Sequence, residues 1–261
     1  MRNKLRNLIM DFTHCYPEEA WKELQDIQYI DCSDIPGCNM YCTPEAEEEI
    51  RCRLKPYGPS GIHFLDSGNY HYVTKLFLEK IKFPFSLIVF DYHNDMQIPL
   101  IHDLTSCGSW AGEVLLAHPF LEQLVLIGPD SRTIEEIPDD RKNRLLCVSL
   151  QELEQNKARQ ALKKIPEHIP LYISIDKDVL GKNYARTNWS QGGMSVRMLE
   201  EILELLLVHR AVIGADICGE CSVGEALPKY LEDERINSRT NKELYLFLRR
   251  IPAVKWEGDI P

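Results

Sequence analysis

Three residues that can bind a metal ion alternate directly after a short apolar run. The run ends at Phe90, and Asp91, His93 and Asp95 follow it. Alternate side chains of an extended chain point the same way, so these three can converge just beyond the end of a buried strand. Carboxylate and imidazole groups together suit a divalent first-row metal, and manganese is favoured over zinc as the share of oxygen ligands rises. A solvated acidic turn is the alternative explanation.

Two further strand ends carry residues of the same kind. Asp176 and Asp178 follow the apolar segment 171–175, and His71 follows a strand predicted at 61–65. Each is ambiguous alone, because a lone histidine is usually structural and paired aspartates can cap a loop. Together, six ligands from three strand ends can bind two divalent ions. Without cations the four carboxylates would repel one another or hold protons, whereas two ions about 3.5–4 Å apart share a water and lower its pKa toward neutral.

A sheet must hold these strand ends side by side. Short apolar segments that alternate with helices or long connections predict eight strands, at residues 7–12, 27–30, 61–65, 85–90, 124–127, 145–148, 171–175 and 211–217. Such runs are typical of a parallel sheet covered by helices on both faces. The first three units are irregular and long loops follow the fourth and seventh strands, so we prefer an open sheet to a closed eightfold barrel. In either architecture ligands bind beyond the carboxyl ends of the strands.

Helix starts are predicted where a capping residue precedes a helical segment. The four clearest are Thr43 before Pro44, the capping box of Ser149 and Glu152, Ser195 before an amphipathic segment, and Thr240 with Glu243 at the start of the last helix.

A net charge of −10 over 261 residues restricts the class of partner. There is no excess of lysine and arginine to neutralise phosphates, so we expect neither nucleic acid nor an anionic membrane as a partner, and a cationic ligand is favoured. Apolar runs fall well short of the roughly 20 residues that cross a bilayer. We therefore expect a cytoplasmic protein that forms one domain over residues 1–261. Its nine cysteines are expected to be free thiols, mostly buried.

The two aspartate segments match known motifs. DYHNDM at 91–96 resembles the DAHxD motif of the arginase, agmatinase and formiminoglutamase family of ureohydrolases, and SIDKDVL at 174–180 resembles its SxDxD segment. GNYHYVT at 68–74 is similar to the segment with the family's first histidine ligand, and TNWSQGGMS at 187–195 resembles its Thr-Pro and Gly-Gly loop. The resemblance covers roughly residues 60 to 225.

This resemblance implies a fold and a ligand set. The fold is a three-layer α/β/α sandwich with an eight-stranded, mainly parallel sheet, and the cofactor is a pair of Mn²⁺ ions, with other divalent metals as an alternative. The implied metal ligands are His71, Asp91, His93, Asp95, Asp176 and Asp178. Asp95 and either Asp178 or Asp91 would bridge the ions, which also gives Asp95 a catalytic role.

The family has a glutamate after its last strand that faces the guanidinium group of the substrate. ADICGEC at 215–221 offers Glu220, although it lies four residues after Asp216 and the family's spacing is three. The resemblance thus implies that Glu220 takes part in substrate binding and catalysis. A carboxylate suits this role, because it can pair with a planar guanidinium.

One loop departs from the arginase pattern. Arginases carry a histidine in a Ser-Gly-Asn-x-His loop, assigned to proton transfer to the leaving amine, whereas residues 106–110 read Ser-Cys-Gly-Ser-Trp. His102 and His14 are the nearest candidates for that role. Trp110 could instead wall off an apolar or stacked part of the substrate. Thr187 and Asn188, at the start of the Gly-Gly loop, are further candidate substrate-binding residues.

These observations predict a binuclear manganese hydrolase that cleaves a C–N bond of a guanidino or amidino substrate. The products would be urea, or a related amide, and an amine. The substrate would be a cationic small molecule or arginine within a peptide, because residues that would fix the α-groups of free arginine are not evident. The alternatives are an amide deacetylase-type hydrolase of the same fold and a non-catalytic metal-dependent ligand-binding protein. A homo-oligomer is left open.

Overall fold

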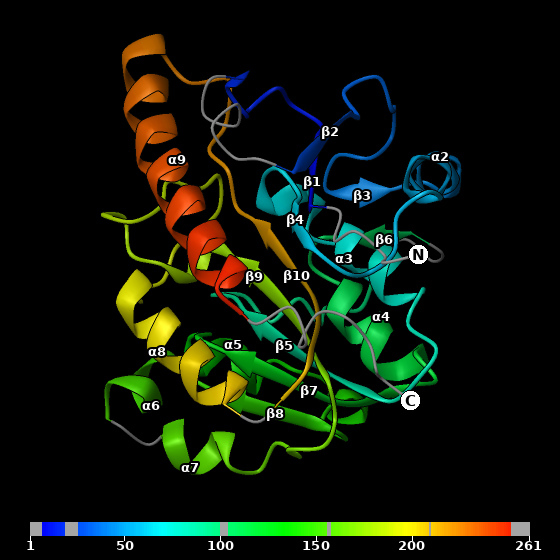
Figure 1. Ribbon diagram of the computed structural model, residues 1–261, viewed down its shortest axis with the longest axis vertical. Helices are drawn as coiled ribbons and strands as arrows, with labels where there is room; N and C mark the ends of the chain where they lie inside the picture. The colour runs from blue at the N-terminus through cyan, green and yellow to red at the C-terminus, as the bar shows by residue number, and fades with distance from the viewer. Residues whose placement is uncertain (1–6, 19–25, 100–103, 156–157, 209, 252–261) are drawn as a thin grey trace.

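One open parallel sheet organises the structure, a computed structural model that describes residues 7–18, 26–99, 104–155, 158–208 and 210–251 (Figure 1). Its strands are β1 (Asn7–Asp11), β2 (Ile27–Asp31), β4 (Ile62–Phe64), β5 (Phe85–Phe90), β7 (Leu121–Ile127), β8 (Leu145–Val148), β9 (Leu171–Asp176) and β10 (Val212–Cys218). In the described part of the chain their order is β2-β1-β4-β10-β9-β5-β7-β8, and every neighbouring pair is parallel. The strand count and the open architecture are as predicted.

Helices cover both faces of this sheet. They are α2 (Pro44–Leu54), α3 (Val73–Leu78), α4 (Trp110–Ala117), α5 (Ser131–Glu135), α6 (Leu150–Glu154), α7 (Ala158–Leu162), α8 (Val196–Leu207) and α9 (Leu227–Arg249). One apolar cluster joins the sheet to α2, α3 and α4, and a second joins the opposite face to α6, α8 and α9. Figure 1 shows these two groups of helices on opposite sides of the strands. The predicted three-layer sandwich is therefore confirmed.

The central strand β5 shows why apolar runs predict this fold. All six of its residues are buried. Leu87 and Val89 pack in the cluster below α3 and α4, whereas Ile88 and Phe90 pack in the cluster on the opposite face. A strand covered on both faces has no polar side, so its sequence reads as a continuous apolar run.

Three of the four predicted helix caps are present. Thr43 accepts a hydrogen bond from the Ala46 amide, Ser149 and Glu152 form a capping box, and Ser195 accepts from the Met198 amide. The fourth prediction is wrong, because Thr240 lies inside α9, which begins at Leu227. Its hydroxyl donates to the carbonyl of Tyr184, so a threonine in the helix interior satisfies its polar atom through a loop contact.

A small second sheet lies apart from the main one. Strand β3 (Tyr41–Cys42) pairs with β6 (Thr105–Ser106) in antiparallel fashion, and the Cys107 amide donates to the Met40 carbonyl at 2.9 Å. Two-residue strands carry no periodic signal, and this pairing was not predicted. All nine cysteines are free, as expected. No described helix is both long enough and apolar enough to cross a membrane.

Candidate metal centre

The predicted ligands follow strands that are neighbours in the sheet. Strand β5 pairs with β9 so that Phe90 lies beside Ile175, which places Asp91 next to Asp176 at the carboxyl edge. Strand β9 then turns into a single 3-10 turn, η3 (Lys177–Val179), whose side chains include Asp178. His71 follows the turn η1 (Gly68–Tyr70) that comes after β4. Local sequence and parallel register together thus gather these residues at one edge.

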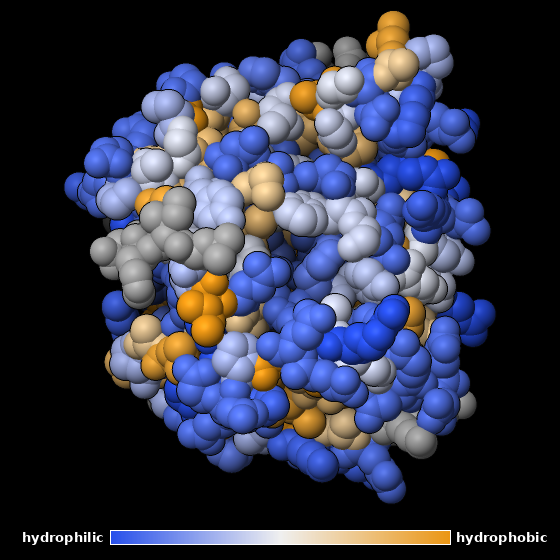
Figure 2. All heavy atoms as spheres, turned by 180° about the vertical axis from the view of Figure 1, so that it is seen from behind, coloured by the Kyte–Doolittle hydropathy of each residue, from blue (hydrophilic) through white to orange (hydrophobic). Residues whose placement is uncertain are grey.

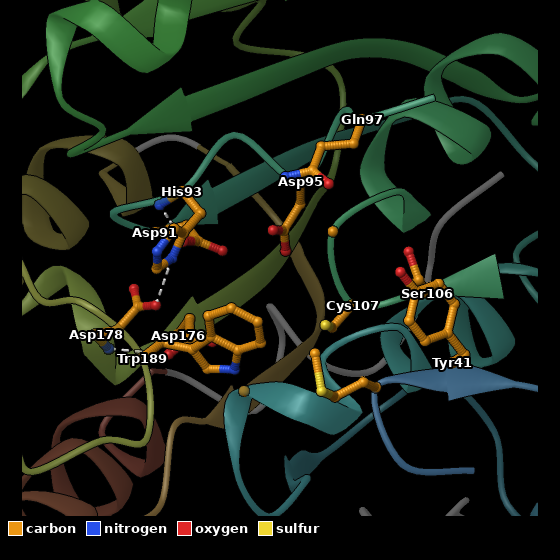
Figure 3. A pocket seen from close by; sticks show the side chains of 13 residues that line it. Tyr41, Asp91, His93, Asp95, Gln97, Ser106, Cys107, Asp176, Asp178 and Trp189 are labelled. Carbon is orange, nitrogen blue, oxygen red and sulfur yellow. Dashed lines mark hydrogen bonds and ion pairs between the residues drawn. The ribbon is translucent and has the colours of Figure 1, made fainter. Parts of the chain in front are cut away.

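Five of the six predicted ligands line one cavity of about 100 Å³ (Figure 3), and the sixth, His71, is buried and is not among the described lining residues. The lining residues are Met40, Tyr41, Gly68, Asp91, His93, Asp95, Gln97, Ser106, Cys107, Gly108, Asp176, Asp178 and Trp189. In Figure 3, Asp91, His93 and Asp178 lie on one side of the cavity, and Tyr41, Ser106 and Cys107 lie on the other. On the face turned away in Figure 1, the surface is mostly hydrophilic and is hollowed near its centre (Figure 2).

His71 points its Nδ1 at three carboxylates. Its Nδ1 is 3.2 Å from an oxygen of Asp91, 3.2 Å from one of Asp95 and 3.6 Å from one of Asp176. This buried Nδ1 has no hydrogen-bond partner in the described structure, and Nε2 contacts the Ser174 hydroxyl at 2.9 Å. An unpartnered buried nitrogen among carboxylates costs stability unless a cation joins the group. The donor set therefore fits a metal ion.

A second group of ligands shares Asp91 with the first. His93 Nδ1 is 2.7 Å from an oxygen of Asp178 and 3.5 Å from Asp91 Oδ1. The other oxygen of Asp91, Oδ2, is the one that faces His71. The two groups, His71 with Asp91 and Asp95 and His93 with Asp91 and Asp178, each have ligand atoms within 4.8 Å of one another. One carboxylate between two groups is the arrangement that a bridging ligand requires.

Cys218 adds a ligand atom that the motifs did not predict. It ends β10, beside Asp176 in the register, and its Sγ donates to Asp176 Oδ2 at 3.2 Å. His71, Asp176 and Cys218 form a further group that could hold a metal ion. The only sequence signal for Cys218 as a candidate ligand was its position. It ends β10, the strand next to β9, and β9 ends in Asp176.

Burial and mutual repulsion change the protonation of the site. Burial, with the charges of Asp178 and Asp91, raises the pKa of Asp176 to about 7. Burial and Asp91 raise the pKa of Asp178 to about 6. Burial alone would lower the pKa of His93, but its hydrogen bonds with Asp178 and Asp91 outweigh this and raise it to about 12. Without cations, then, part of this cluster holds protons, as expected for carboxylates crowded together.

Metal binding is expected to depend on pH and to release protons. A cation must displace protons from Asp176, Asp178 and His93, so the affinity for Mn²⁺ should rise from about pH 5.5 to about pH 8 and continue to rise above it. The metal-free protein should lose stability as pH rises from about 4 to about 7, because only the folded state still holds the protons of Asp176 and Asp178. Calorimetry in two buffers of different ionisation enthalpy measures both affinity and proton release. Equal affinity across this range, with no proton release, would contradict the prediction.

Trp110 lies below the cavity and does not wall it, contrary to our expectation. It is fully buried at the start of α4, among the apolar residues under the sheet. Its indole Nε1 donates to Asp95 Oδ2 at 2.7 Å, and its ring packs against His71 with 4.7 Å between centroids. Trp110 thus helps to orient Asp95 and His71, two candidate ligands, and does not itself line the cavity.

Glu220 also differs from its expected position. It is only 3% exposed and does not line the described cavity. Its carboxylate is paired with the ammonium group of Lys177 and accepts from Asn241 Nδ2 at 2.7 Å. Gly219, directly before Glu220, has φ of +90° and packs against Asp176 and Lys177, and the next residue, Glu220, pairs with Lys177 of η3.

The other three predicted site residues are not in the cavity wall that is described. The Thr187 hydroxyl donates to the Trp189 carbonyl at 3.1 Å, and Asn188 Nδ2 donates to Asn69 Oδ1 at 2.8 Å. Both therefore shape the loop that carries Trp189, whose role the sequence did not indicate. His102 lies outside the described residues.

Comparisons with known proteins agree with the fold. A family model described as the Arginase family matches residues 3–234. An uncharacterised protein from Thermotoga maritima is 33% identical over 233 residues, which cover 88% of this chain and 85% of that protein. The solved arginase of Entamoeba histolytica, in complex with L-ornithine, is similar with a TM-score of 0.66 at 13% identity, over 94% of this chain and 98% of that one. A hypothetical agmatinase from Burkholderia thailandensis is similar with a TM-score of 0.61 at 19% identity, over 95% and 87%.

The fold and the site define a three-layer α/β protein with clustered carboxylate and imidazole groups at the carboxyl edge of its sheet. The chain belongs to the arginase family, which confirms the predicted resemblance. As a member, it is a hydrolase of C–N bonds other than peptide bonds.

Proposed function

We propose that this protein is a manganese-dependent, two-metal hydrolase that cleaves a guanidino or amidino C–N bond and yields urea, or a related amide, and an amine. One observation carries the proposal: six candidate ligand side chains from three strand ends lie close together, and five of them line one small cavity. The proposed substrate is a cationic small molecule or an arginine side chain within a peptide. Family membership supports the reaction class.

The proposed ligands are His71, Asp91, His93, Asp95, Asp176 and Asp178. Two divalent cations would balance the four carboxylates and relieve their repulsion. When bound, such a pair supplies an activated water and polarises the carbon under attack. Oxygen atoms dominate this set, which favours manganese over zinc among first-row metals.

Residues of the chain would hold the reacting groups in place. The Trp110 indole fixes one oxygen of Asp95 and leaves the other free to face the cavity. His93 is anchored through Nδ1 by Asp178, while Nε2 contacts the Ser190 hydroxyl at 2.8 Å. The small cavity limits the water that surrounds the reacting group. We keep His102 as the proposed proton donor to the leaving amine.

Metal analysis and a product assay test this proposal. Protein expressed with added manganese should contain about two Mn²⁺ per chain. It should release urea from at least one member of a panel of arginine, agmatine, guanidino acids and arginine-containing peptides. Absence of stoichiometric divalent metal would overturn the metal centre. Full metal loading without turnover of any member, or of an acetylated amine, would favour the non-catalytic alternative.

A further inference from the structure

We infer that the substrate is a planar guanidino or amidino group attached to a remainder that carries no charge, and that Trp189 provides the surface against which this group stacks. The inference rests on the proposed function and names the substrate class for the same site. Three features carry it: the sequestered carboxylate of Glu220, the uncharged side chains that the described residues place in the outer wall of the cavity, and the rigid placement of Trp189.

Glu220 cannot hold a substrate cation in this structure, because it already holds an internal one. Lys177 is fully buried, and its ammonium group contacts both Glu220 and Asn241 Oδ1, the latter at 2.7 Å. Asn241 Nδ2 also donates to Glu220, so all three polar groups are paired with one another. Freeing Glu220 for a ligand would leave the Lys177 charge buried without a charged partner, which is strongly unfavourable.

Among the described residues, the outer wall of the cavity carries no other acidic or basic side chain. Apart from the candidate metal ligands and Gly68, the described lining residues are Met40, Tyr41, Gln97, Ser106, Cys107, Gly108 and Trp189, none of which has a carboxylate, ammonium, guanidinium or imidazole group. These side chains offer aromatic and thioether surface, one amide, one thiol and two hydroxyl groups. An ammonium or carboxylate group on the substrate's remainder would lose water here without gaining a charged partner, and such burial is unfavourable.

Trp189 presents a fixed aromatic face at the cavity. Its indole Nε1 donates to Asn69 Oδ1 at 2.9 Å, and its ring meets His93 edge-on with 5.8 Å between centroids. Gly68 lies so close that a Cβ atom there would be 2.9 Å from the Trp189 ring. Figure 3 shows the ring beside the cavity, between Asp178 and Cys107. An aromatic face attracts a planar cation by stacking and by cation–π interaction.

The size of the cavity agrees with this class of ligand. About 100 Å³ is well below the roughly 300–1,000 Å³ of pockets that enclose a whole drug-sized ligand. The cavity accommodates a small planar head group, and the remainder of the substrate passes the neutral wall of Tyr41, Gln97 and Cys107.

A matched pair of ligands tests the charge requirement. Agmatine and N-acetylagmatine share the guanidino group and the four-carbon spacer, but only agmatine carries a second positive charge. We expect the manganese-loaded full chain to bind N-acetylagmatine at least about tenfold more tightly than agmatine by calorimetry. Urea release is measured in parallel. Equal binding, tighter binding of agmatine, or no binding of either compound would overturn the inference.

Substitutions at Trp189 test the stacking surface. Trp189→Ala should weaken N-acetylagmatine binding by about 3- to 30-fold, and Trp189→Phe should retain most of it. Phe83→Ala removes a half-buried aromatic ring at the opposite, amino-terminal end of β5 and is the matched control. Loss of affinity in Phe83→Ala equal to that in Trp189→Ala, or none in either, would contradict the stacking role. Because binding is measured directly, manganese-loaded protein that binds N-acetylagmatine but releases no urea would refute the proposed reaction and leave this inference standing.

Discussion

Replacing Asp91 by asparagine is expected to remove stoichiometric manganese and with it the hydrolase activity. Asp91 presents one oxygen to His71 and the other to His93 and Asp178, so it belongs to both ligand groups. Loss of an outer-shell partner typically costs about 10- to 100-fold in metal affinity, and loss of a ligand shared by two ions should cost more. Metal content after dialysis and the shift in Tm on adding Mn²⁺ measure the effect.

Two comparison variants sharpen this prediction. His93 belongs to one ligand group, so His93→Asn should reduce the content to about one ion per chain, whereas Asp91→Asn should bring it close to zero. Asp139 has a side chain 95% exposed on the surface, and Asp139→Asn should leave metal content and activity unchanged. Asparagine keeps an acceptor for the His93 amide, which Asp91 now binds at 2.6 Å, so Asp91→Asn should remain folded. Two ions per chain in Asp91→Asn would refute the shared-ligand assignment.

The sheet and the clustering of the candidate ligands were predictable because their signals are local. A strand buried on both faces requires an unbroken apolar run, and β5 and β9 show one. The candidate ligands follow those runs directly, so parallel alignment of the strands brings them together without further information. The polar residues after a buried strand in an α/β protein therefore carry much of the information on its site.

The wall of the cavity was not predictable, because its residues are far apart in the sequence. Tyr41 reaches the site through the two-residue strand β3, and Trp189 through a loop held by Asn69. Trp110 and Glu220 stand in segments that correspond to family motifs, but tertiary packing decides where their side chains point. Trp110 is a core residue of the hydrophobic cluster that includes α4, and Glu220 is the counter-ion of the buried Lys177.

Lys177→Met is expected to destabilise the protein strongly although it removes no metal ligand. The substitution leaves the Glu220 carboxylate buried opposite an apolar side chain, and breaking a buried ion pair from one side costs about 3–5 kcal/mol. The double variant Lys177→Met with Glu220→Gln should recover much of this loss, because a neutral amide can still pair with Asn241. Urea-induced unfolding of the metal-free proteins measures the free energies of unfolding.

This pattern distinguishes an internal ion pair from a substrate-binding glutamate. If Glu220 served the substrate and not Lys177, Glu220→Gln alone would weaken ligand binding without changing the free energy of unfolding, and the double variant would be no more stable than Lys177→Met. Lys142→Met, which removes an exposed partner of Asp139, serves as the control and should leave stability unchanged.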